Sequence, residues 1–180
     1  MFDQIADEFR SIYKSIDDAQ RRAATTMMTG KVTAIDGKRI RLELLPVDGR
    51  TGKPFLSPWV QCQEAAGITS TNTPVRLGDP MRLLSPNGEL GPQSLAIRDS
   101  HTEDNPNPAN GDELVIGHDG AVIRMSSEAI VFELDGMSIR LSGGKIDITS
   151  SELTHNGRNI GSTHVHGGIE RGGSDTATPH

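Results

Sequence analysis

Two histidines one residue apart, His164 and His166, have the residue type and spacing best suited to chemistry in this chain. In an extended segment the side chains of residues i and i+2 point to the same side, so both imidazoles can face one point. Neutral imidazole is the commonest protein ligand for transition metals. Two ligands do not complete a closed metal site, but a threefold assembly would bring six ring nitrogens to its axis. We predict such a metal site at His164 and His166; the alternative is an ordinary polar loop.

A catalytic metal is the less favoured interpretation of these histidines. Water activation needs an open coordination position and a nearby carboxylate base. Glu170 and Asp175 are the only close acidic residues, and six imidazoles would leave no open position. The chain also lacks a Gly-x-Ser-x-Gly elbow, a His-Glu-x-x-His motif and a phosphate-binding loop. We therefore expect no catalytic residues and no enzymatic activity.

The composition narrows the class of protein. The 180 residues are only 34% hydrophobic and 3% aromatic, and the net charge of -6 disfavours nucleic acid as a partner. The single cysteine excludes an intrachain disulfide. No apolar run approaches the ~20 residues that span a bilayer, and the N-terminus does not resemble a signal peptide. We expect a protein made in soluble form.

The segment 1–24 predicts an amphipathic helix. Neither glycine nor proline interrupts it, and acidic residues in its early turns and arginines in its last suit the helix dipole. The stripe either packs on its own domain or docks on a partner or on sister chains, and both interpretations remain open here. Apolar residues recur at spacings of three and four: Phe2, Ile5, Phe9, Ile12, Ile16 and Ala19.

The segment 25–98 predicts a small Greek-key barrel of the oligonucleotide/oligosaccharide-binding (OB) type, because about five short alternating strands follow one another. Such barrels often bind single strands through aromatics on a basic groove. Only Phe55 and Trp59 are candidates here and the charge is unfavourable, so a structural adaptor is favoured. The predicted strands cover residues 28–35, 38–44, 59–62, 81–84 and 95–97, and the stretch 47–58 is rich in turns.

A polar linker, 99–112, separates the barrel from a regular strand array, 113–161. In the array, strands of about five residues with one apolar face alternate with tight turns such as Asp135-Gly136 and Gly143-Gly144. A single ribbon of this kind leaves its apolar face partly exposed to solvent, and no other segment is long enough to cover it. Identical ribbons covering one another around an axis would solve this, which predicts a rotationally symmetric oligomer, with three chains as the smallest ring that encloses a core.

The last segment, 162–180, contains the two histidines and then a glycine-rich tail. The order of helix, small barrel, strand array and terminal Thr-His-x-His-Gly-Gly followed by Gly-Gly resembles the baseplate assembly protein V family, the central tail spikes of contractile-tailed bacteriophages. The stretch Leu83–Leu90 also resembles the barrel of that family. The matching tail residues are Thr163, His164, His166, Gly167, Gly168, Gly172 and Gly173.

The resemblance implies a homotrimer that is mainly β. Its barrel would sit at the baseplate hub beside the tail tube, and an intertwined triple-stranded β-helix would taper to a tip formed by 162–180. In relatives, the His-x-His motifs of three chains hold one iron ion per trimer, which would assign His164 and His166 as its ligands. The implied function is puncture of the host outer membrane during tail contraction, as a part of the virion.

Two alternatives remain at the level of sequence. The same design suits the spike of a contractile bacteriocin or secretion particle. The barrel could instead be an OB-type binding module for polysaccharide or nucleic acid, which retention on peptidoglycan or heparin would reveal.

Overall fold

The computed structural model describes residues 2–45, 49 and 51–165, and it is mainly β with a single helix among them. The chain consists of two compact units, Met1–Asn107 and Pro108–His180. The first unit contains the helix and a barrel, and the second contains the strand array. Within the described ranges, no helix is long and apolar enough to cross a membrane.

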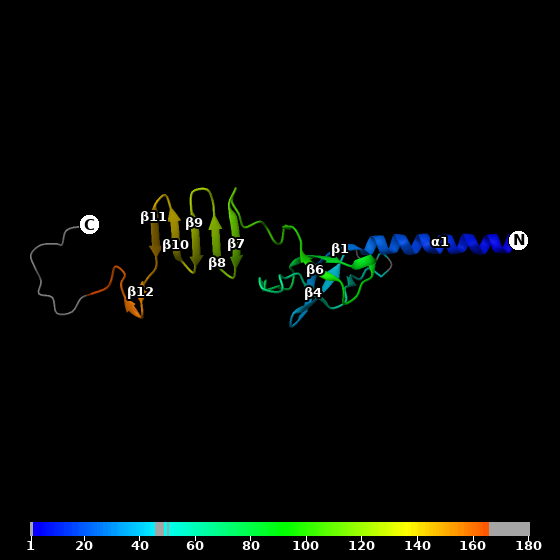
Figure 1. Ribbon diagram of the computed structural model, residues 1–180, viewed down its shortest axis with the longest axis horizontal. Coiled ribbons are helices and arrows are strands. Elements are labelled where there is room, and N and C mark those ends of the chain that lie inside the picture. Colours follow the sequence, from blue (N-terminus) through cyan, green and yellow to red (C-terminus); the bar gives the residue numbers. More distant parts are fainter. Residues whose placement is uncertain (1, 46–48, 50, 166–180) are drawn as a thin grey trace, which may run out of the picture. The chain divides into compact units, whose positions relative to one another are not determined.

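Helix α1 spans Phe2–Thr25, which confirms the predicted helix (Figure 1). Its apolar stripe does not pack on the barrel: Phe9 is 57% exposed and Ile12 is 54% exposed. Contact with the barrel is confined to the C-terminal end of the helix, where the Thr25 hydroxyl donates to the carbonyl of Gly88 at 2.6 Å. Of the two interpretations of the stripe, packing against its own domain is therefore wrong.

Five strands close into a small barrel, as predicted. Going round it, the order is β1-β2-β4-β6-β5 and back to β1, with β4 and β6 parallel and the other neighbours antiparallel. A short strand, β3, lies within the stretch predicted to be rich in turns and pairs with β2. The bounds are β1 Met27–Asp36, β2 Arg39–Leu44, β3 Phe55–Leu56, β4 Val60–Cys62, β5 Pro80–Leu84 and β6 Leu95–Arg98, with a 3-10 turn, η1, at Pro86–Gly88.

The barrel core follows from the alternation of its strands. In β2, Ile40, Leu42 and Leu44 are buried, and they alternate with residues that are exposed or half-buried. Ser57 lies at the edge of the core, where its hydroxyl accepts the Leu42 amide at 2.8 Å. The core consists of Val32, Ile40, Leu42, Leu44, Val60, Met81, Leu83 and Ala96.

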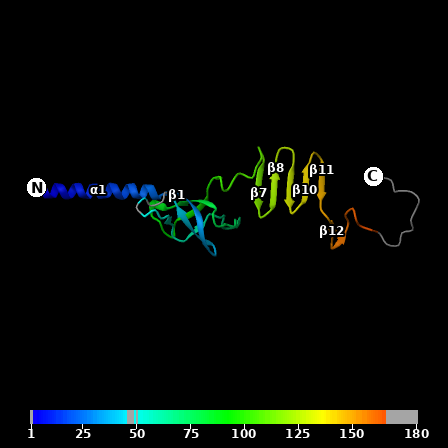
Figure 2. The same cartoon turned by 180° about the vertical axis from the view of Figure 1, so that it is seen from behind.

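The second unit is a one-layer antiparallel sheet in which each strand pairs with the next, in the order β7-β8-β9-β10-β11. Figure 2 shows the sheet from behind, and no described element of this unit lies across it in either view. The bounds are β7 Leu114–His118, β8 Ala121–Met125, β9 Ile130–Leu134, β10 Met137–Ser142, β11 Lys145–Thr149, and the small hairpin β12 Thr154–His155 with β13 Arg158–Asn159.

Tight turns set the register of this sheet. Asp135 and Gly136, which join β9 to β10, have φ of 48° and 83°. Positive φ at both central residues is the type I′ turn, whose twist matches that of paired strands. Gly143-Gly144 repeats the geometry between β10 and β11. A two-residue turn fixes which residues lie opposite one another, so the apolar positions of successive strands stay in step.

The structure thus shows a mainly β chain with one N-terminal helix and a small five-stranded barrel. Of the predicted tip, 162–180, residues 162–165 are described, and His166 with the rest of the tail lies outside the described residues.

Candidate functional site

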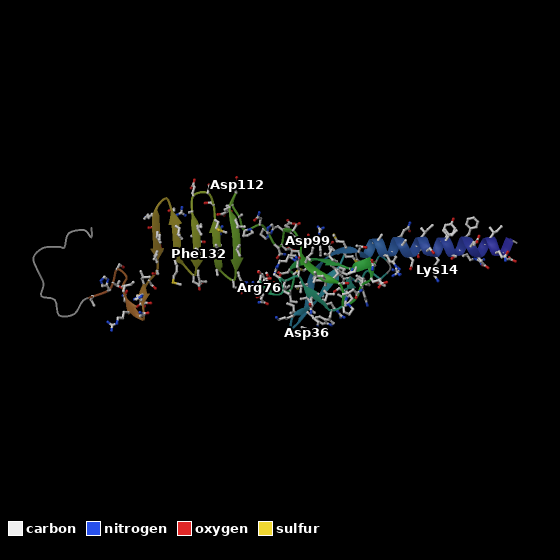
Figure 3. The ribbon with its side chains drawn as sticks, in the orientation of Figure 1. Lys14, Asp36, Arg76, Asp99, Asp112 and Phe132 are labelled. Atoms are coloured by element: carbon white, nitrogen blue, oxygen red, sulfur yellow. The ribbon has the colours of Figure 1, made fainter. Side chains whose placement is uncertain are left out.

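The sheet β7–β11 carries an unbroken apolar face. Cross-strand pairing forms two rows across the sheet, and each row takes one side chain from each of the five strands. Phe132 of β9 lies at the middle of one row, between Ile123 and Ile139 (Figure 3). We call this surface the apolar face. Its residues are Leu114, Ile116, Ile123, Met125, Ile130, Phe132, Leu134, Met137, Ile139, Leu141, Ile146 and Ile148.

This face is open to solvent in the single chain. Ten of its twelve side chains are among the exposed large hydrophobic residues, with Phe132 at 44% and Ile146 at 67%. A face of this size on a monomer marks an interaction surface. Ala129, in the β8–β9 turn, is the one buried apolar residue of this unit among the residues described.

The opposite face of the sheet is polar and already internally paired. The Arg124 guanidinium donates to the carboxylate of Glu113 at 2.8 Å and to that of Glu133 at 3.4 Å. Lys145 and Asp147 form a further ion pair at 2.6 Å. Because these charges are satisfied within one chain, this is the face suited to remain in water.

His164 lies beyond the last hairpin, and its ring is oriented by the backbone. Its Nδ1 lies 2.6 Å from the carbonyl oxygen of Gly161. A carbonyl oxygen can only accept, so Nδ1 carries the hydrogen, and in the neutral ring the lone pair is on Nε2. A ligating histidine typically donates its other ring nitrogen to a carbonyl or carboxylate in this way. The observed geometry therefore fits a metal ligand that binds through Nε2.

The loop that orients His164 is itself hydrogen-bonded. The Asn159 side chain accepts the Gly161 amide at 2.8 Å and donates to the Thr163 hydroxyl at 2.8 Å. The Ile160 amide donates to the carbonyl of Leu153 at 2.8 Å, which ties this loop back to the chain after β11. The sequence did not reveal that the carbonyl of Gly161 pairs with the His164 ring, because every residue has a backbone carbonyl and residue type does not show which one is used.

No group of three or more histidine, cysteine, aspartate or glutamate side chains gathers to hold a metal among the residues that the structure describes. Of the other histidines in this unit, His155 lies in β12, and His118 faces Asp119 at 3.4 Å.

The barrel offers a less suitable site. Trp59 is half-buried, and the Arg41 guanidinium lies 5.2 Å from the centre of its ring, so the ring is already occupied by a cation–π contact. Phe55 is exposed on the short strand β3. The two candidate aromatics therefore differ in exposure, and one of them already stacks with an arginine.

A polar cluster on the barrel joins the two ends of the loop that follows β4. The Glu64 carboxylate accepts the Thr73 amide at 2.6 Å and the Thr71 hydroxyl, and these hydrogen bonds hold the pKa of Glu64 below its ordinary value. Nearby, burial raises the pKa of the Cys62 thiol, which keeps it in its less reactive neutral form. The hydrogen bonds of Glu64 to Thr71 and Thr73 close the loop that follows β4.

Two members of the apolar face, Leu114 and Ile116, were not identified from the sequence. They alternate with Val115 and Gly117, so the period-two signal was present but short. Pairing with β8 places them on the same side as Met125 and extends the face to the edge strand.

The comparisons with known proteins give no family for this chain. No model of a known protein family matches its sequence, and no curated protein is detectably similar to it.

Proposed function

We propose that this chain is a structural tail spike of a contractile-tailed bacteriophage, resembling the baseplate assembly protein V family. Three copies form the spike. In this proposal the barrel is of OB type and attaches to the baseplate hub and tail tube, and the strand arrays wind into a triple-stranded β-helix. The protein is made in the host cytoplasm, becomes part of the virion, and is driven against the host outer membrane.

The observation that carries the proposal is the apolar face. One sheet layer cannot bury twelve large apolar side chains against itself, whereas three such sheets with these faces turned to a common axis bury all of them. Most of these side chains are about half exposed, so covering them contributes about 1 kcal/mol each, or roughly 10 kcal/mol per chain. The self-paired charges on the other face then form the outer wall.

The same arrangement explains why such a part could puncture a membrane without turnover. The turns that join β9 to β10 and β10 to β11 have two residues each, so they add no long loops to the spike. A narrow closed prism resists bending because its interior is close-packed and its strands are hydrogen-bonded. Function is then a matter of stiffness and shape.

At the tip, His164 and His166 would hold one iron ion per trimer. The ion would cross-link the three chains where the cross-section is too thin for an apolar core, and unfolding the tip would then require loss of metal–ligand bonds. The hydrogen bond from Nδ1 of His164 to Gly161 supports this assignment, because it orients the ring.

The test is native mass and metal content measured together on the purified full chain. We expect a trimer with one iron per three chains. In the His164→Ala/His166→Ala double variant we expect the trimer to remain and the metal to be lost. His155→Ala is the matched control, because His155 is an exposed histidine of the same unit outside the predicted ligand set, and it should retain full metal.

Two outcomes would contradict the proposal. A monomer would refute the spike. A trimer whose metal content is unchanged in the double variant would refute the assignment of these ligands.

A further inference from the structure

The exposed stripe of α1 has the spacing of a coiled-coil seam. Its apolar positions are separated by four, three, four, three and four residues, so each recurs after seven residues, as in a heptad with two apolar positions. A strict 3.5-residue repeat differs from the 3.6 of a straight helix, and it predicts helices that wind around one another with a left-handed supercoil. We call these positions the seam. They are Ile5, Phe9, Ile12, Ile16, Ala19 and Ala23.

The seam is unoccupied by the rest of the described chain. All six seam residues are exposed, although the helix is joined firmly to the barrel at its last turn. Amphipathic helices gain most of their stability from packing of the apolar face. A helix of 24 residues with this whole face in water therefore requires a partner surface.

The residue types at the seam indicate how many helices meet. In the heptad that the seam defines, Ile5 and Ile12 occupy position d, and Phe9 and Ile16 occupy position a. A β-branched residue at d disfavours two-stranded packing, and isoleucine at both a and d favours three or more strands.

The charges of α1 leave the seam clear. The ion pairs Asp7–Arg10, at 2.7 Å, and Asp18–Arg21, at 2.9 Å, join outer positions of the heptad. Lys14, labelled in Figure 3, is also at an outer position, f. The flanking positions e and g hold Ala6, Glu8, Tyr13, Ser15, Gln20 and Arg22, so like charges do not meet across neighbouring helices.

The junction with the barrel sets the direction of the helices. The Thr25 hydroxyl donates to the carbonyl of Gly88, and Arg22 pairs with Glu89 at 3.3 Å. A Cβ atom at Gly88 would collide with the backbone carbonyl of Arg22, so the helix and η1 are in close contact. Helices attached in the same way to barrels related by a rotation axis run parallel and in register.

We propose that the α1 helices of three copies of this chain form a parallel, in-register, three-stranded coiled coil along the seam. This rests on the proposed trimer for the number of chains, and it assigns α1 to the sister chains and not to a different protein. The helix would thus hold the N-terminal end of the assembly together by its own contacts.

Cysteine cross-linking of the full chain tests this arrangement. Ile12→Cys and Ile16→Cys place a thiol at a d and an a position, and Lys14→Cys is the matched control on the outer side of the same turn. The unaltered chain, with only its half-buried Cys62, gives the baseline. Each variant is treated with a short bis-maleimide and its native mass is measured in parallel.

We expect covalent dimers from Ile12→Cys and Ile16→Cys, each within a trimer, and only baseline cross-linking from Lys14→Cys. A trimer in which the seam cysteines cross-link no more than Lys14→Cys would overturn the coiled coil and leave the spike proposal intact. Efficient seam cross-links in a trimer without metal would support the coiled coil and refute the proposed tip. A monomer would overturn both.

Discussion

Individual residues of this chain act mainly by fixing geometry. Nδ1 of His164 is tied to the Gly161 carbonyl, which determines the ring nitrogen that can bind a metal. The Arg41 guanidinium lies over the Trp59 ring and occupies one of its faces. Both effects depend on one or two contacts, so both respond to a single substitution.

Asp99 is the residue at which pH should matter most for the barrel. The Ser100 amide, at 2.7 Å, and Arg82, at 2.9 Å, hold the pKa of Asp99 below its ordinary value of 3.8. A carboxyl whose pKa is lower in the folded state stabilises the fold fully above its unfolded pKa, and this contribution is lost as the pH falls through the folded value.

We therefore expect Asp99→Asn to lower the free energy of unfolding by about 1 kcal/mol at pH 7, and to have little effect well below pH 3.8. Urea unfolding of the parent chain and of Asp99→Asn, at pH 7 and well below pH 3.8, measures this difference in the free energy of unfolding. An equal loss at both would show that packing, and not charge, is responsible. Asp36→Asn is the matched control, because Asp36 pairs with Arg39 at an exposed turn and its loss should be near zero.

At the scale of the elements, each apolar face needs a partner. The barrel strands turn theirs inward and bury Leu42 and Leu83 completely. The strands β7–β11 and the helix α1 have no described partner in the single chain. The barrel thus completes its core within one chain, whereas the apolar faces of β7–β11 and α1 remain exposed in it.

A pair of substitutions on β9 separates the two faces of the sheet. Phe132→Asp introduces a charge at the middle of the apolar face, between Ile123 and Ile139. Val131→Asp puts the same residue one position earlier, on the polar face between Arg124 and Arg140. Burying an unpaired carboxylate costs several kcal/mol, whereas a carboxylate beside arginines in water costs little.

We expect Phe132→Asp to disrupt the assembly of the sheets and Val131→Asp to leave it intact, as measured by sedimentation and by protease resistance of the region after Asn107. If both variants assembled like the parent chain, the apolar face would not be the core of the spike. If only Val131→Asp failed, the polar face would be the one turned inward.

At the scale of the whole molecule, stability should depend on association. In the proposed trimer the strand array and α1 gain their burial from sister chains, so the melting temperature of the array should rise with protein concentration. The barrel transition should change less, because its core of eight buried residues is complete in one chain. Calorimetry over a hundredfold range of concentration measures this, and concentration-independent melting of every transition would argue against an obligate assembly.

The amino-acid sequence by itself determined the local structure of this protein. The 3.5-residue spacing of Ile5, Phe9 and Ile12 defines the helix, and the alternation of Ile40, Leu42 and Leu44 defines a barrel strand. The pair Asp135-Gly136 defines a turn. These signals are local, because helix, strand and turn are set by side chains within a few residues of one another.

Only the tertiary structure decided which strands are neighbours. The parallel pairing of β4 with β6, which closes the barrel, joins segments some distance apart in the chain and has no local signature. The tautomer of His164 depends on the backbone carbonyl of Gly161. Such features arise from contacts between distant groups or from backbone atoms, and the order of residue types does not encode them directly.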